Sequence, residues 1–360
     1  MINAAKKILI IGILCGVAFA SSALGLDTTS FNKGTPHRII RTCCAFGNEV
    51  GLAVIPFIKM SDIISKENIG THQYLGGKSE GNGIMYTYKG GFIDLGHLRD
   101  QSDWTAYLHS LILNNRGNPN TEIMLGKEGG LKTLVLQIPS DISSENAVLL
   151  AGRIAYDLSV WHEIATWYGA STVPFVPERY SSFSVEDDYS NQLGVVIGIQ
   201  ALLSNQPYNE AVTSILKNKL DTLEVVQTIE ESYQAMDMVN GKWWSQEYKF
   251  PSKNFLLKHQ IASYDTTYPL LIPELSKVDK SPLPVEIPMN TINNIPLTNF
   301  YSLIFKLNGK IPYAKIFHEK KVKKLITNHD FLLLLENIHK ETQLLKYRKL
   351  KRKAAKKYLT

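Results

Sequence analysis

Hydrophobic and polar positions follow two different periods along the first part of the chain. Apolar residues recur every three to four positions in four stretches, which predicts helices over residues 98–114, 146–168, 185–203 and 209–238. Shorter apolar runs bounded by turn residues predict strands at 38–42, 84–88, 92–95 and 131–138, the middle two forming a hairpin. Strands and helices do not alternate as regular units. The pattern therefore favours an α+β fold with a predominantly helical core and a small antiparallel sheet.

The pattern changes after residue 240. Eight of the fifteen prolines lie between Pro251 and Pro312, and aromatic residues such as Trp243 and Trp244 accompany them. Proline interrupts regular hydrogen-bonded ladders, whereas aromatic rings are stabilised when they pack on an apolar surface. We therefore expect a main α+β domain over residues 21–240, a proline-rich extended segment over 241–312 packed on it, and a helical tail over 313–360.

The net charge of +6 is unevenly distributed. Residues 315–360 hold fourteen Lys/Arg and four Asp/Glu, a local balance of +10, which leaves the other 314 residues at 6 − 10 = −4. A mildly acidic body gives no basic groove, so no nucleic-acid partner is expected. The basic C-terminal tail, densest between Lys346 and Lys357, is predicted to contact an anionic membrane surface.

The N-terminus has the pattern of a secretory signal peptide. Lys6 and Lys7 precede a run of thirteen mostly apolar residues from Ile8 to Ala20, which ends in the small-x-small pattern of residues 18–20. Such a run is too short to span a bilayer comfortably. We expect residues 1–20 to be removed by cleavage after Ala20, and the mature protein to be periplasmic or secreted.

His162 and Glu163 are the first candidates for chemistry. Their helix places small or apolar neighbours around His162, so the imidazole should be buried and should need a hydrogen-bond partner or a metal. The zinc-protease motif needs a second His at position 166, where Thr stands. A metal site would therefore take ligands from other elements. We hypothesise that His97 and His162 bind a divalent metal, most naturally zinc, with Glu163 as general base of a hydrolase.

Two other interpretations stay open. Cys43 could be the nucleophile of a cysteine-dependent hydrolase if a histidine activates its thiol. Alternatively, both histidines are satisfied core residues, and the protein is a noncatalytic envelope protein that binds partners through its aromatic-rich body. In the hydrolase interpretations the substrate would be an amide or ester of the cell envelope.

Four longer motifs carry a family resemblance. Residues 41–47 (RTCCAFG), 90–100 (GGFIDLGHLRD), 151–167 (AGRIAYDLSVWHEIATW) and 177–184 (PERYSSFS) resemble the bacterial domain-of-unknown-function family 4056. The resemblance covers roughly residues 38–204 and weakens through the proline-rich part. It implies an exported bacterial protein, and it assigns neither an activity nor functional residues.

Overall fold

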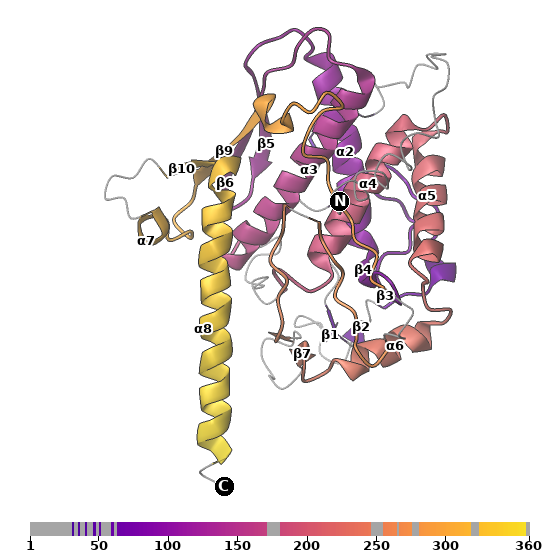
Figure 1. Cartoon of the computed structure of the whole chain (residues 1–360), viewed down its shortest axis with the longest axis vertical. Coiled ribbons are helices and arrows are strands. Elements are labelled where there is room, and N and C mark those ends of the chain that lie inside the picture. Colours follow the sequence, from indigo (N-terminus) through magenta and orange to yellow (C-terminus); the bar gives the residue numbers. More distant parts are fainter. Residues whose placement is uncertain are drawn as a thin grey trace, which may run out of the picture. The chain divides into compact units, whose positions relative to one another are not determined.

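The structure is a computed structural model, and it describes part of the chain within a single unit, Phe31–Thr360. The described residues are 31, 35–36, 40–41, 46–47, 50–51, 59–60, 63–170, 181–245, 255–264, 266–275, 281–317 and 324–357. Together they form an α+β fold with a helical core and a small antiparallel sheet, as the sequence pattern predicts (Figure 1).

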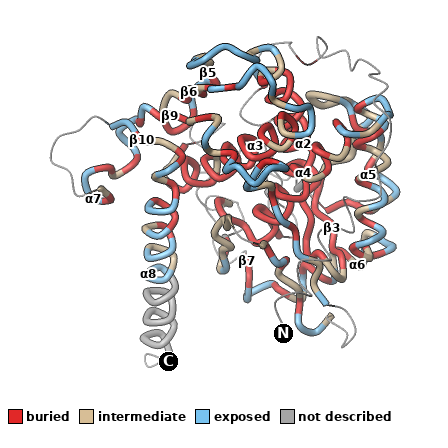
Figure 2. Tube along the Cα trace, turned by 45° about the horizontal axis from the view of Figure 1, so that its top comes forward, coloured by how far each residue is buried: buried red, intermediate tan, exposed pale blue. Residues whose placement is uncertain are grey.

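Three helices form the centre of the fold. α2 (Leu95–Asn114), α3 (Ser144–Trp167) and α4 (Asp187–Leu203) pack against one another, and buried positions run along all three (Figure 2). Every residue from Leu95 to Ser110 is buried, so α2 is enclosed on all sides. Because α2 also carries many polar side chains, each of them needs a partner inside the protein.

Glycines set the distance between these helices. A Cβ on Gly194 of α4 would lie 2.1 Å from the carbonyl oxygen of Leu98 on α2, closer than any real contact. The side chain of Ser102 also donates a hydrogen bond to the carbonyl of Gly194 at 2.9 Å. α2 and α4 therefore approach each other backbone to backbone, and this contact brings their N-terminal turns together.

A hairpin and two further helices lie next to this core. The expected hairpin is present as β3 (Ile84–Thr87) and β4 (Gly91–Asp94), and β4 leads directly into α2. The single helix expected over 209–238 is wrong. The chain instead forms α5 (Tyr208–Thr222) and α6 (Ile229–Met238). Glu224 has a φ of 55° after α5, and Thr228 and Glu231 form a capping box that begins α6.

The main sheet combines distant parts of the sequence. Its order is β10-β9-β6-β5, all antiparallel, with β5 (Thr121–Lys127), β6 (Gly130–Leu136), β9 (Tyr301–Leu307) and β10 (Leu325–Thr327). The proline-rich region thus supplies β9, a strand inside the sheet. Trp161 of α3 stacks on Phe305 of β9 with ring centroids 4.1 Å apart, which joins the sheet to the helical core.

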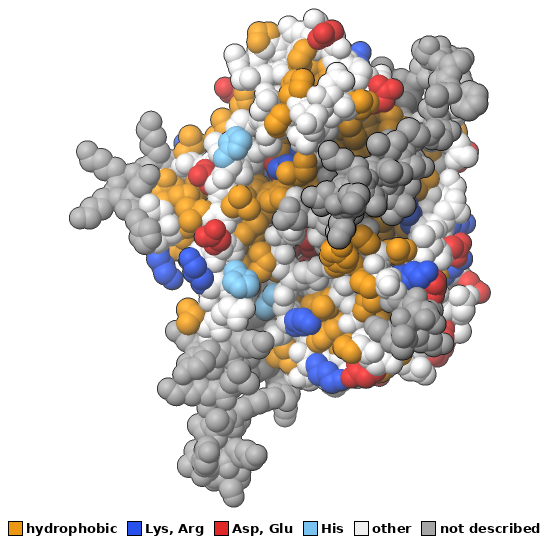
Figure 3. Space-filling model, viewed as in Figure 1, with side chains coloured by type: hydrophobic (Ala, Val, Ile, Leu, Met, Phe, Trp, Pro, Cys, Tyr) orange, Lys and Arg blue, Asp and Glu red, His pale blue; other side chains and the backbone are white. Residues whose placement is uncertain are grey.

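Shorter elements complete the described part of the chain. Two-residue strands pair as β1 (Val50–Gly51) with β2 (Lys59–Met60) and β7 (Trp244–Ser245) with β8 (Phe255–Leu256), and α7 spans Tyr313–Phe317. The last element, α8, runs from Phe331 to Lys357. Within the described ranges, every helix is too short or too polar to cross a bilayer. Hydrophobic and charged side chains are interspersed on the face seen in Figure 3.

Candidate functional site

His97 lies in the first turn of α2, where the helix cap fixes its position. The Asp94 carboxylate accepts hydrogen bonds from the backbone N–H groups of Gly96 at 2.6 Å and His97 at 3.2 Å. The Nδ1 atom of His97 lies 3.2 Å from Oδ1 of Asn191 on α4. Because that oxygen can only accept, the contact favours a proton on Nδ1, and in the neutral ring Nε2 then keeps its lone pair.

His162 lies near the C-terminal end of α3 and has a similar arrangement. Its Nδ1 atom is 2.7 Å from Oε1 of Glu128, and Oε2 of Glu128 accepts a hydrogen bond from Lys132 Nζ at 2.9 Å. Glu128 stands in the tight turn between β5 and β6, and Trp161 Nε1 donates to its carbonyl at 2.9 Å. A carboxylate held by the sheet thus fixes the orientation of an imidazole on the helical core.

The Nε2 atoms of both histidines lie close to carboxylate oxygens. His97 Nε2 is 3.7 Å from Asp187 Oδ1, and His162 Nε2 is 4.0 Å from Glu163 Oε1. The two imidazole rings have centroids 6.2 Å apart. The other oxygen of each carboxylate is held by the chain just before α4. Phe183 N–H donates to Glu163 Oε2 at 2.6 Å, and Ser184 N–H donates to Asp187 Oδ2 at 2.8 Å.

The site is rich in buried carboxylates. Asp94, Glu163, Glu186 and Asp187 are each at most 4% exposed. Among the ion pairs of the described residues, none joins these four groups to a Lys or Arg. Burial raises the pKa of Asp187 well above its usual range, the negative charge of Glu163 raises it further, and His97 opposes the shift. Burial likewise raises the pKa of Glu186 to about 8, against the hydrogen bond from Ser184.

A small pocket adjoins the two imidazoles. Its volume is about 30 Å³, and its walls include His97, His162, Asn191, Lys132 and Trp104. Glu163 and Asp187 instead line a narrower space on the neighbouring side of Asn191. The pocket has room for about one water molecule, so only a small group can enter it in this conformation.

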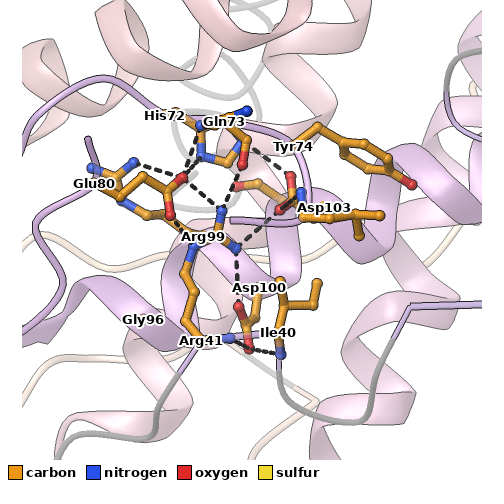
Figure 4. A network of polar contacts seen from close by, with 12 residues as sticks. Ile40, Arg41, His72, Gln73, Tyr74, Glu80, Gly96, Arg99, Asp100 and Asp103 are labelled. Atoms are coloured by element: carbon orange, nitrogen blue, oxygen red, sulfur yellow. Dashed lines mark hydrogen bonds and ion pairs between the residues drawn. The ribbon is translucent and has the colours of Figure 1, made fainter. Parts of the chain in front are cut away.

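A second buried polar cluster occupies the next turns of α2, shown in Figure 4. Arg41 donates to both oxygens of Glu80 at 2.7 Å, to Asp100 at 3.0 Å and to Asp103 at 2.9 Å. Arg99 adds a contact to Glu80 at 3.3 Å, and His72 Nε2 lies 3.0 Å from Asp103. Burial would raise the pKa of Glu80, but the hydrogen bonds and charge of Arg41 lower it to about 2. This cluster is a closed ion network that fixes residue 41 to α2.

Three of the predicted site residues come together, and the fourth lies outside the described residues. His97, His162 and Glu163 meet where α2, α3 and α4 converge, whereas Cys43 falls within 42–45, which the structure does not describe. Ser184 and Asp187 stand three positions apart before α4, which is the spacing of a capping box. Asp187 does accept from the Ser184 backbone, but the Ser184 hydroxyl bonds Glu186 instead, and Asp187 turns its second oxygen toward His97.

The described residues hold no group of three His, Cys, Asp or Glu side chains already at metal-binding distances. Two imidazoles on one tetrahedral zinc ion would have ring centroids about 5 Å apart, from bond lengths of about 2.1 Å. The observed 6.2 Å is longer. Binding one ion would therefore require the two rings to approach by about 1 Å.

The family of the chain follows from a comparison with known families. The model of DUF4056, a protein family of unknown function, matches residues 32–273, about two thirds of the chain, so the chain belongs to this family. The match includes His97, His162, Glu163 and Asp187. No curated protein and no solved structure matches the chain.

Proposed function

We propose that this member of the DUF4056 family is a metal-dependent hydrolase that cleaves an amide or ester of the bacterial cell envelope. In this proposal His97, His162 and Asp187 bind a divalent cation, and Glu163 is the general base. Zinc suits a set of two imidazoles and one carboxylate best. One observation carries the proposal: side-chain oxygens hold Nδ1 of both histidines, and both Nε2 atoms face buried carboxylates.

The residues around the histidines support this assignment. Metal-binding histidines usually donate their other N–H to a carboxylate or carbonyl oxygen, which fixes the ring and raises its basicity. Glu128 and Asn191 occupy these positions for His162 and His97. Lys132 forms an ion pair with Glu128 at 2.9 Å, so a cation lies beside the carboxylate that accepts from His162. We assign Glu128 and Asn191 as positioning residues.

The proposed reaction divides its tasks among these groups. A divalent cation would polarise the substrate carbonyl and lower the pKa of water. Glu163 Oε1 accepts one proton from the attacking water, whose oxygen forms a bond to the carbonyl carbon. The bond from that carbon to nitrogen or oxygen then breaks, and Glu163 returns the proton to the leaving group. The Phe183 N–H bond to Oε2 keeps the base oriented while Oε1 stays available.

The test starts with zinc binding to the full chain. The chain is purified without chelator, its zinc content is measured, and urea unfolding is compared in EDTA and in buffered zinc. At a free zinc concentration 100 times Kd, bound zinc should add about 2.7 kcal/mol to the free energy of unfolding. His97→Gln, His162→Gln and Asp187→Asn should each remove this gain. His339→Gln, at an exposed position on α8, is the matched control and should keep it.

Hydrolysis distinguishes the base from the ligands. Glu163→Gln should keep zinc and lose ester hydrolysis, measured with p-nitrophenyl acetate, because Gln cannot accept the proton. If the wild-type protein binds no divalent metal and Cys43→Ser alone abolishes hydrolysis, the cysteine mechanism replaces this proposal. If there is neither metal nor activity, and the substitutions only lower stability, the protein is a noncatalytic binding protein.

A further inference from the structure

The first half of α8 is fixed to the body of the protein. Phe331, Leu334, Leu335 and Ile338 are buried. Polar contacts continue this attachment: Trp167 Nε1 donates to Glu341 Oε2 at 2.9 Å, and Asn337 Nδ2 donates to the Tyr168 hydroxyl at 2.9 Å. The helix is therefore anchored at the end of α3 as far as Glu341.

Residues 342–345, the next ones whose side chains are described, lack this cover. None of residues 342–345 is buried, and Leu344 and Leu345 are 56% and 39% exposed. The backbone nevertheless stays helical to Lys357, which is 357 − 341 = 16 residues further. At 1.5 Å per residue this extension is about 24 Å long.

The extension carries a high positive charge. Residues 342–357 contain eight Lys/Arg and no Asp/Glu. Like charges three and four positions apart on a helix repel each other, which destabilises the extension in water. An anionic surface would remove the repulsion and stabilise the extension.

We propose that residues 342–357 of α8 bind the anionic headgroup layer of a lipid membrane and attach the protein to that surface. Charge complementarity supplies the attraction, and the exposed Leu344 and Leu345 give apolar area that can enter the layer. These leucines favour lipid over nucleic acid, because a phosphate backbone offers them no apolar contact. The inference is independent of the hydrolase proposal, since it uses none of the site residues.

The experiment uses the full chain and co-sedimentation with vesicles. Binding should be strong to phosphatidylcholine vesicles that contain phosphatidylglycerol, weak to pure phosphatidylcholine, and reduced by salt. Arg352→Glu/Lys353→Glu should weaken binding by at least ~25-fold, since each lost cation contributes ~five-fold. Lys78→Glu/Lys217→Glu makes the same charge change at exposed positions outside α8 and should leave binding unchanged.

A second variant tests the apolar contribution. Leu344→Ser/Leu345→Ser keeps every charge and should leave weak, fully salt-sensitive binding. Circular dichroism and thermal unfolding of each variant exclude a folding defect. The proposal is overturned if the full chain ignores anionic vesicles at low salt, or if the α8 and control variants lose binding equally. Tight binding to duplex DNA without vesicle binding, unaffected by the leucine substitutions, would assign the extension to nucleic acid instead.

Discussion

Two buried polar clusters share helix α2 and differ in how their charges are matched. In the Arg41 cluster, Glu80, Asp100 and Asp103 all contact a guanidinium group. In the histidine cluster, the nearest cationic or basic groups to Asp187 and Glu163 in the described ion pairs are imidazoles, 3.7 and 4.0 Å away. Buried carboxylates without fixed cations must take up protons or bind a cation. The two clusters thus differ in charge matching: the carboxylates of the first contact guanidinium groups, whereas those of the second form no ion pair with Lys or Arg among the described residues.

Breaking the Arg41 cluster should have the largest effect on stability. Arg41→Met leaves the buried Asp100 without its cation and leaves Glu80 with Arg99 as its remaining guanidinium partner. This change should lower the free energy of unfolding by about 3–5 kcal/mol. Urea denaturation measures this loss. Lys217→Met, at an exposed position on α5, should change it by less than about 0.5 kcal/mol. A loss for Arg41→Met below about 1 kcal/mol would contradict the interpretation of a closed network.

His109 gives a histidine reference outside both clusters. Burial, with a smaller contribution from the charge of Arg116, lowers its pKa to about 4. The unfolded chain therefore binds a proton first as the pH falls below about 6.5, and stability is lost from there toward the folded pKa. Between pH 7.5 and 5 this group should remove about 2 kcal/mol from the free energy of unfolding. His109→Gln should flatten this part of the pH profile, and an unchanged profile would refute the assignment.

Removing a carboxylate should change the free energy of unfolding in opposite directions in the two clusters. In chelator-treated protein, Asp187→Asn should raise the free energy of unfolding by about 1 kcal/mol. The buried Asp187 must either carry a charge beside Glu163 or take up a proton at its raised pKa, whereas the neutral amide does neither. Asp103→Asn should lower it, because Arg41 then loses a partner. Parallel urea titrations compare the two variants. Equal losses would show that both clusters are structural.

An exposed ion pair should show the smallest effect. Lys66 and Asp221 form a salt bridge with side chains 33% and 58% exposed. Water and salt screen such a pair, so Asp221→Asn should change the free energy of unfolding by no more than about 0.5 kcal/mol. A larger change would mean that ion pairing without burial is enough to explain the loss in the free energy of unfolding that we expect for Arg41→Met.

Local patterns predicted the helical core but missed most of the sheet. The helices α2, α3 and α4 and the β3-β4 hairpin have clear periodicity, so their positions follow from sequence alone. β9 also alternates, with Tyr301, Leu303, Phe305 and Leu307 buried, but it lies among prolines that suggested irregular chain. β5 is largely exposed, so its alternation is weak. Residues 130–136 pair with residues 301–307, far away in the sequence, and the local hydrophobic pattern of either segment does not predict this pairing.

The candidate site was predictable only where residue type was unusual. A histidine among small and apolar helix neighbours pointed to His162, and a second histidine beside carboxylates pointed to His97. Asp187 gave no such signal, because an Asp three positions after Ser184 has the spacing of a helix-capping residue. Glu128 lies in a glycine-rich turn that is typical of solvent-exposed hairpins, and only packing against α3 buries it to 4% exposure. A residue of this kind can be recognised as a site residue only once the packing of the sheet against the helices is known.

The contact at Gly194 has a consequence for the spacing of the site. His97 is the neighbour of Leu98, whose carbonyl lies where a side chain at position 194 would begin, and Asn191 is one helical turn before Gly194. A single methyl group at this position would push α2 and α4 apart and would lengthen the gap between His97 and Asp187 with them. The absence of a side chain at Gly194 therefore sets the distance between the His97 and Asp187 side chains, although Gly194 has no functional group itself.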